Sequence, residues 1–204
     1  MDFYLKDVPK LDIKDLEYLA ENGHYLFRIA IAKRKDCPEY ILKKLSQDKF
    51  ETVQEAVASN ENCPIYLLRD LVDHAVLYNK HGVKFNAVVN PSCPIDILEK
   101  FYRKYGFACG ILKNPNCLEI ILEKIVLLQD RYLTIKVIAH KNCTNKILNI
   151  IYKNSSISDI EYYLQSNKCP FYFLKAVYKS DRNDLKEFKC KITNHVNWEL
   201  RDFE

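Results

Sequence analysis

The chain has 204 residues, of which 48% are hydrophobic and 28% charged, and it carries a net charge of +4. This composition is typical of a folded globular protein, and the sequence pI of about 8.5 lies below the value above about 9 that often marks a nucleic-acid-binding domain. No apolar run is long enough to span a bilayer, and the first residues lack the basic and apolar segments of a secretion signal. We therefore expect a cytoplasmic, non-membrane protein whose cysteines are reduced.

Six of the eight cysteines recur in register, with successive gaps of 26, 30, 24, 26 and 26 residues. They are Cys37, Cys63, Cys93, Cys117, Cys143 and Cys169. A leucine follows each of them after five positions, at Leu42, Leu68, Leu98, Leu122, Leu148 and Leu174. Another apolar residue follows after eight positions, at Leu45, Leu71, Phe101, Ile125, Ile151 and Val177. This register predicts a helical repeat of about 26 residues.

The frame continues beyond both ends of the cysteine series. Val8 occupies the cysteine position in the first unit, followed by Pro9, and His195 occupies it in the last unit. The chain is thus predicted to be one solenoid domain over 1–204, with about eight units. Residues 1–35 and 181–204 form the capping units, and 36–180 form the central repeats.

Each unit is predicted to contain two helices. The longer one begins with proline at its first helical position, where the missing N–H has no intrahelical partner, and with the cysteine, or the asparagine before it, at the N-cap. A shorter apolar segment precedes each cysteine and suits a short α-helix or a 3-10 helix. No strand-like alternation persists, so the fold class is all-α. The gap of 30 residues before Cys93 predicts an insertion between His74 and Gly82.

The frame Asn-Pro-x-Cys-Pro-x-x-x-Leu-x-x-Leu resembles the variant leucine-rich repeat family, a HEAT-like helical solenoid. It is clearest at 90–94 and 114–117. The resemblance implies α-helices alternating with 3-10 helices in two layers of a right-handed superhelix, and it implies no shared activity. Leu118 and Thr144 replace the proline, and the Val-Arg pair usual in the short helix survives only as Phe27-Arg28. One family member carries an iron–sulfur cluster on clustered N-terminal cysteines, which this chain lacks.

The cysteines do not have the spacing of a metal site. No Cys-x₂₋₄-Cys pair occurs, and equivalent cysteines one repeat apart would be separated by roughly 10 Å. We interpret them as small buried hydrophobic residues and predict neither a metal nor a cofactor. His140 lies three residues before Cys143, but it stands where other repeats have asparagine and is interpreted as a turn residue. No catalytic residue is assigned, and the chain is predicted not to be an enzyme.

The third position after each cysteine lies at the edge of the apolar stripe. It holds Tyr40, Tyr66 and Tyr172, and Trp198 in the last unit. Aromatic residues of this kind are favoured at binding hot spots, although covering the seam between helices would also account for them. Basic residues stand nearby, namely Lys43, Lys44 and Arg69.

Several functions remain open at this stage. The first is a non-catalytic scaffold, adaptor or inhibitor that binds another protein. The second is a nucleic-acid-binding protein that uses a basic face. The basic face would comprise Lys33, Arg34, Lys35, Lys43, Lys44 and Arg69. The third is an enzyme or redox sensor that uses Cys143 or Cys109. A bacterial or phage setting, with the chain as a small inhibitor of a host complex encoded by a phage or mobile element, is a further hypothesis about context. The oligomeric state is left open.

Overall fold

A computed structural model describes residues 4–165, 169, 171–179 and 183–184. Regular structure in these residues is entirely helical, which confirms the all-α prediction. Contacts divide the chain into two compact units, 1–114 and 115–204, and each unit is described by itself. Trp198 and nearly all of the predicted C-terminal capping unit lie outside the described residues.

The first unit contains η1 (Leu5–Lys10), α1 (Ile13–Asn22), α2 (Tyr25–Ala32), α3 (Glu39–Leu45), α4 (Glu51–Ser59), α5 (Ile65–Leu77), α6 (His81–Val89), α7 (Ile95–Tyr105) and α8 (Ala108–Ile111). The second unit contains α9 (Glu119–Val126), α10 (Arg131–Ile138), α11 (Asn145–Asn154), α12 (Ile157–Leu164) and α13 (Phe171–Tyr178). Apart from η1, these elements are α-helices. The short segments that precede the cysteines are thus α-helices and not 3-10 helices.

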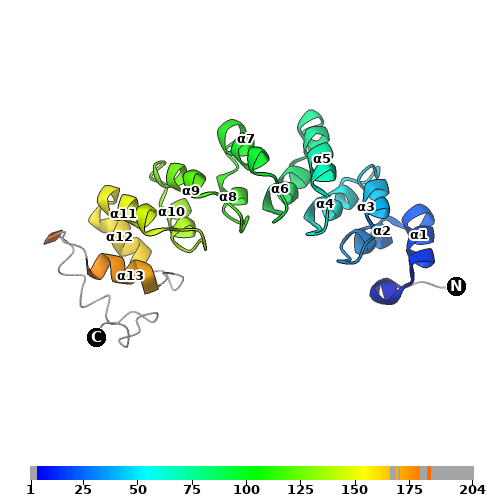
Figure 1. The fold of residues 1–204 in the computed structure, drawn as a ribbon, viewed down its shortest axis with the longest axis horizontal. Coiled ribbons are helices and arrows are strands. Elements are labelled where there is room, and N and C mark those ends of the chain that lie inside the picture. Colours follow the sequence, from blue (N-terminus) through cyan, green and yellow to red (C-terminus); the bar gives the residue numbers. More distant parts are fainter. Residues whose placement is uncertain (1–3, 166–168, 170, 180–182, 185–204) are drawn as a thin grey trace. The chain divides into compact units, whose positions relative to one another are not determined.

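Helices two apart in sequence pack on each other within each unit. In the first unit α2 contacts α4, α4 contacts α6, α6 contacts α8, and α1 contacts α3. In Figure 1, α3, α5 and α7 form one row and α4, α6 and α8 a second row. In the second unit α9 contacts α11, α11 contacts α13, and α10 contacts α12. From α3 onward, the odd-numbered helices are those that follow one of the six repeat cysteines.

The buried face of the odd-numbered helices is the one that the sequence predicts. The leucines five positions after each cysteine and the apolar residues eight positions after it are all buried. Burying one such side chain contributes about 1.5–3 kcal/mol. Five of the six repeat cysteines are buried with them, and Cys143 is partly buried. The repeated apolar residues therefore form the core.

The helices begin one residue later than expected. Pro38 has a φ of −59° and a ψ of 142°, so its carbonyl accepts from the N–H of Leu42 at 3.1 Å while its own backbone is not helical. Pro64 and Pro94 do the same. Proline is thus the N-cap, and the cysteine lies just outside the helix. The placement of proline at the first helical position is wrong because only its φ, and not its ψ, is helical.

The first repeat, which contains η1 and α1, has a different register from the one predicted. Val8 lies inside η1, and α1 starts after Asp12, whose carboxylate accepts a hydrogen bond from the backbone N–H three residues on, at 2.9 Å. Ile13, expected to be buried, is 58% exposed, whereas Leu16 is buried. The cysteine position is therefore taken by Leu11, 26 residues before the first cysteine. The placement of Val8 in that position is wrong by three residues.

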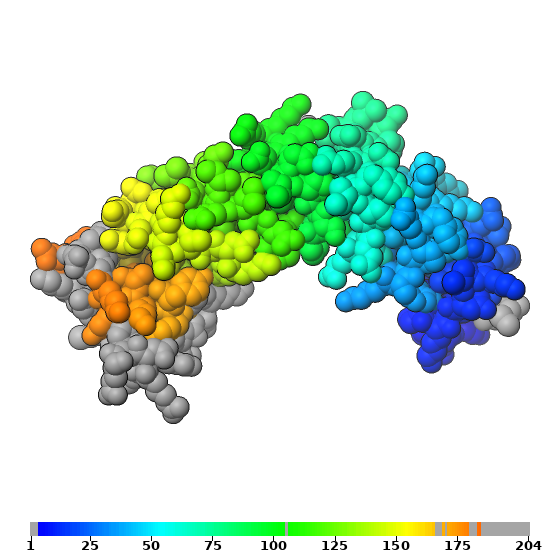
Figure 2. Space-filling model, viewed as in Figure 1, coloured from blue at the N-terminus to red at the C-terminus, as the bar shows by residue number. Residues whose placement is uncertain are grey.

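The long spacing before Cys93 lengthens α5. This helix has 13 residues, whereas α3 has seven. It ends in a turn where Asn79 has a φ of 54°, and the N–H of Lys80 donates to the carbonyl of Ala75 at 2.9 Å, the closing bond of a left-handed C-cap. Leu77 at its end is 74% exposed. The end of α5 thus extends beyond α3 (Figures 1 and 2).

Candidate protein-binding surface

Buried asparagines join three loops of the first unit, each to the preceding loop. Their Nδ2 atoms each donate to two backbone carbonyls about one repeat earlier, from Asn60 to Ala32 and Arg34, from Asn90 to Ala58 and Asn60, and from Asn114 to Val88 and Asn90. These bonds are 2.7 or 2.8 Å long. Because the acceptors are backbone atoms, this linkage does not depend on which side chains the preceding repeat carries. It fixes the spacing of the helices that display the surface.

The asparagine directly before the cysteine has another role than the one predicted. It was expected to cap the helix, but the Nδ2 atom of Asn62 donates to the carbonyl of Lys35 at 2.6 Å. In the second unit the Nδ2 atom of Asn142 likewise donates to the carbonyl of Cys117 at 2.8 Å. His140 accepts from the N–H of Asn142 through Nδ1 at 3.1 Å. His140 thus serves the turn, as its sequence position indicates.

The repeat thiols are held in their protonated form. Burial raises the pKa of Cys37 to about 11 and the pKa of Cys63, Cys93, Cys117, Cys143 and Cys169 to about 12. The Sγ atoms of Cys37 and Cys63 lie 3.8 and 3.9 Å from the carbonyl oxygen of the following proline. A thiol at neutral pH is far less reactive than a thiolate. Among the described residues no group of three or more His, Cys, Asp or Glu is placed to hold a metal ion.

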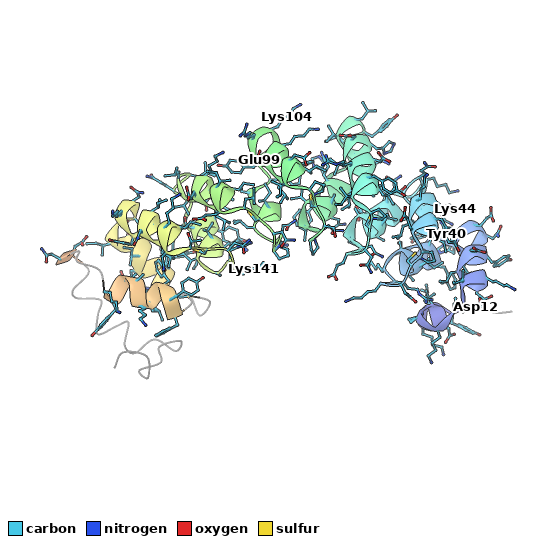
Figure 3. All side chains as sticks on the ribbon, viewed as in Figure 1. Asp12, Tyr40, Lys44, Glu99, Lys104 and Lys141 are labelled. Carbon is cyan, nitrogen blue, oxygen red and sulfur yellow. The ribbon has the colours of Figure 1, made fainter. Side chains whose placement is uncertain are left out.

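Exposed side chains form pairs across the seams, the lines along which successive odd-numbered helices meet. In the α1–α3 seam, the Tyr40 hydroxyl donates to Glu17 at 2.5 Å. One turn further on, Lys44 forms an ion pair with Glu21 at 3.2 Å. Tyr40 and Lys44 are labelled on α3 in Figure 3. Both turns of this seam are closed by a side-chain pair.

The α5–α7 seam repeats this arrangement with different residues. Arg69 donates two hydrogen bonds to Asp96 at 2.7 and 2.8 Å, a bidentate geometry that fixes both side chains. One turn further on, Lys100 lies 3.6 Å from Asp73. In the second unit, Lys146 pairs in the same way with Glu123 of the preceding odd-numbered helix.

The α3–α5 seam is closed in its first turn and open in its second. Tyr66 donates to Glu39 at 2.8 Å, but one turn further on the position that corresponds to Glu21 and Asp73 holds Gln47, which has no charge to pair with Asp70. Both belong to the described part of the chain. A hollow of about 390 Å³ opens here, lined by Lys43, Ser46, Gln47, Gln54, Leu67, Asp70, Leu71 and His74. The greater length of α5 accounts for it, because α3 ends at Leu45 and leaves the later turns of α5 uncovered.

Five exposed apolar or aromatic residues lie at the N-terminal ends of the odd-numbered helices in the first unit. We call them the apolar strip. They are Ile13, Tyr40, Ile65, Tyr66 and Ile95, each 43–58% exposed. The isoleucines are the first residue of α1, α5 and α7, and the tyrosines are the second residue of α3 and α5. Each of the four odd-numbered helices thus has an exposed apolar or aromatic residue at its first or second position, although Glu39 takes the isoleucine position in α3.

The remaining predicted site residues do not join the apolar strip. Tyr172 belongs to the second unit, where its hydroxyl donates to the carbonyl of Ile138, and burial raises its pKa to about 12. Lys44 and Arg69 are engaged in the seams, and Lys43 lines the hollow. The three isoleucines of the apolar strip were missed by the sequence analysis. Ile65 and Ile95 stand two positions after a cysteine, off the buried stripe, and that offset is the signal that identifies them.

Comparisons with protein-family models, with curated proteins and with solved structures found no match. The resemblance to the variant leucine-rich repeat family therefore rests on the sequence frame alone. Within the part of the chain that the structure describes, no helix is both long and apolar enough to cross a membrane.

Proposed function

We propose that the chain is a non-catalytic helical-repeat solenoid, similar to the variant leucine-rich repeat family, that binds another protein through its first unit. The observation that carries this proposal is the apolar strip, in which Ile13, Ile65 and Ile95 are each more than half exposed. Single exposed apolar residues are ordinary on protein surfaces, but a row with at least one of them at the first or second position of each of four successive odd-numbered helices is not accounted for by packing. Rows of this kind mark interaction sites.

The tyrosines of the apolar strip support the same function. The hydroxyls of Tyr40 and Tyr66 are held by Glu17 and Glu39, so their rings have a fixed orientation before any partner arrives. A rigid aromatic ring loses little conformational entropy on binding. Fixed rings flanked by exposed isoleucines suit the apolar centre of a protein–protein interface, where tyrosine is enriched.

The charge pairing argues for a protein partner over a nucleic acid. Lys44 and Arg69 are paired with carboxylates in the seams. Arg34 is paired with Asp36 at 2.6 Å and also donates to backbone carbonyls of η1 and the residue after it. Phosphate groups would have to displace these carboxylates. A basic face that tracks a nucleic-acid backbone needs unpaired cations in series.

Site-specific photo-crosslinking tests the proposal. A benzophenone amino acid is placed at position 65 of the full chain, and at position 26 of α2 as a matched control, because Leu26 is also an exposed hydrophobic residue. Illumination in cells that make the protein is expected to give one heterologous protein adduct from position 65 and none from position 26. Ile95→Lys is expected to abolish the adduct.

Two results would overturn the proposal. One is equal crosslinking from positions 65 and 26, or none from either. The other is micromolar, salt-sensitive binding of labelled duplex or single-stranded DNA or RNA in an anisotropy titration at two salt concentrations, which would favour the nucleic-acid alternative.

A further inference from the structure

A histidine occupies the asparagine position in one turn of the second unit. In the first unit, the side-chain oxygens of Asn60 and Asn90 each accept a hydrogen bond from the backbone N–H two residues on, at 2.8 Å. The Nδ1 atom of His140 accepts in the same way from the N–H of Asn142, at 3.1 Å. Only 7% of the His140 side chain is exposed. This turn therefore uses a buried imidazole nitrogen where the others use an amide oxygen.

The two kinds of acceptor respond differently to acid. An asparagine oxygen remains an acceptor at ordinary pH, whereas an imidazole that takes up a second proton becomes a donor at both nitrogens. Histidine is the side chain that ordinarily makes this change between about pH 5 and 8. A proton on Nδ1 of His140 would point at the N–H of Asn142, which is itself a donor. The hydrogen bond that closes the turn therefore cannot form with a protonated ring.

The residue that this bond orients joins the turn to the preceding repeat. The Nδ2 atom of Asn142 donates to the carbonyls of Pro115 and Cys117, at 3.2 and 2.8 Å, in the loop before α9. The N–H of Cys143 donates to the carbonyl of His140 at 2.9 Å, so the same turn also sets the position from which α11 starts. Loss of the Nδ1 bond would therefore loosen the link between the loop before α9 and the loop before α11.

Other ionisable groups around the turn do not change charge in mild acid. They are Lys141 and Cys143 in the turn (Figure 3 labels Lys141), Cys117 and Glu119 in the segment that Asn142 and Thr144 contact, and Tyr172, whose hydroxyl donates to the end of α10. Burial raises the pKa of both thiols to about 12. Amines, phenols and carboxylates ordinarily titrate outside the range of about pH 5–8. Among these described groups, the histidine is thus the one that responds.

We propose that the turn at 140–143 is a pH-sensitive joint of the second unit, which opens as the pH falls below about 6.5, the ordinary midpoint for a histidine in water. The closed turn requires Nδ1 of His140 without a proton, and the opened turn lets the ring take one from water. The opened form therefore binds more protons, so acid shifts the equilibrium toward it. The matching turns of the first unit, which are built on Asn60 and Asn90, contain an amide that does not respond.

Amide hydrogen exchange of the full chain, followed by NMR at pH 7.5 and 5.5, tests the joint. The readouts are the N–H groups of Asn142 and Cys143. After correction for the intrinsic exchange rate, the opening constant of this turn is expected to rise about tenfold, because the proton-free fraction of an exposed histidine falls from about 0.9 to about 0.1. The corresponding N–H groups of Asn62 and Ser92 in the first unit should change less than about twofold.

Two substitutions separate this histidine from the other groups. His140→Asn introduces the residue of the other turns, which keeps the acceptor but takes up no proton, so the opening constant should become independent of pH within about twofold. His24→Asn is the matched control. His24 also accepts through Nδ1, from the N–H of Leu26 at 3.5 Å, but it is exposed and lies in the first unit. Its replacement should leave the response of Asn142 unchanged.

Two exchange results would overturn the inference. One is an opening constant in the parent chain that is the same at both pH values, and the other is a tenfold rise that persists in His140→Asn. The position of the ring proton is tested separately. A long-range proton–nitrogen NMR spectrum at pH 7.5 should show the His140 proton on Nε2, and a proton on Nδ1 would contradict the acceptor role on which the joint depends.

Discussion

The strongest test of the stacking is removal of one buried asparagine. Asn90, 2% exposed, donates to the carbonyls of Ala58 and Asn60 and accepts from the N–H of Ser92 at 2.8 Å. In Asn90→Ala the carbonyl of Asn60 keeps a bond from the backbone N–H of Cys63, but the Ala58 carbonyl and the Ser92 N–H lose these partners. At 1–3 kcal/mol for each orphaned group, the free energy of unfolding should fall by about 3 kcal/mol.

Two further variants separate the bonds from the volume of the side chain. Asn90→Asp keeps the acceptor but directs a carboxylate at two carbonyl oxygens in a buried site, so it should destabilise the protein more than Asn90→Ala at pH 7. Ser92→Ala removes one exposed hydrogen bond to the carbonyl of Glu61 and should cost less than about 1 kcal/mol.

Urea unfolding followed by circular dichroism measures these changes, and hydrogen exchange of the α4 and α6 amides assigns them to the first unit. A loss below about 1 kcal/mol in Asn90→Ala would refute the reasoning, since removal of a buried, doubly donating amide costs more than that. So would an Asn90→Asp variant as stable as the unmodified protein, because it would mean that the two carbonyls do not face the side chain.

Three other perturbations test further features of the structure. Arg28→Ala should lower the free energy of unfolding by about 3–5 kcal/mol in the same urea assay. The reason is that Asp48, whose side chain is 8% exposed, would be left as a buried charge without its arginine. The control Lys35→Ala breaks a long, exposed ion pair and should change the free energy of unfolding little. Labelling of the native protein with iodoacetamide, followed by peptide mapping, should modify exposed Cys109 well before the six repeat cysteines, and rapid modification of any of those six would contradict their burial. The free energy of unfolding should fall as the pH rises above 9. In the folded state the repeat thiols have pKa values of about 11 or 12, whereas the ordinary value is 9.0. Because the unfolded chain therefore loses these protons first, the free energy of unfolding drops by up to about 1.4 kcal/mol per pH unit for each thiol. Urea midpoints at pH 8 and 10 measure this effect, and a Cys63→Ala variant that showed the same fall as the parent would count against a contribution from that thiol.

The buried face could be predicted from the sequence because burial imposes a strict period. A residue five or eight positions after the cysteine meets the neighbouring helices in every repeat, so Leu68 and Leu122 could not be exchanged for polar residues without a large cost. The prediction was wrong at Val8. Val8 and Pro9 match the apolar residue and the proline of the frame, but the match left the N-cap of the following helix out of account. Asp12 followed by an acidic residue three positions later is an N-terminal signal, and it outweighs Pro9.

The exposed residues could be predicted only in part. The hydroxyls of Tyr40 and Tyr66 bridge the seam, as one of the two interpretations expects, while about half of each side chain stays exposed. Their role in binding stays a prediction. The hollow could not be predicted, because it depends on the difference in length between α3 and α5. The gap of 30 residues predicts extra chain, but whether that chain forms a loop or extends a helix is decided by how α5 ends at Asn79.

The contrast between the two kinds of linkage explains how one repeat can present different surfaces. Asn60 and Asn90 donate to backbone carbonyls, which every residue provides. The stacking of helices therefore survives changes of side chain in the preceding repeat. The seams are joined side chain to side chain, as between Arg69 and Asp96, so a change on one helix opens a gap unless its neighbour also changes. A framework fixed through the backbone thus leaves the side-chain pairs of the seams free to differ from one repeat to the next.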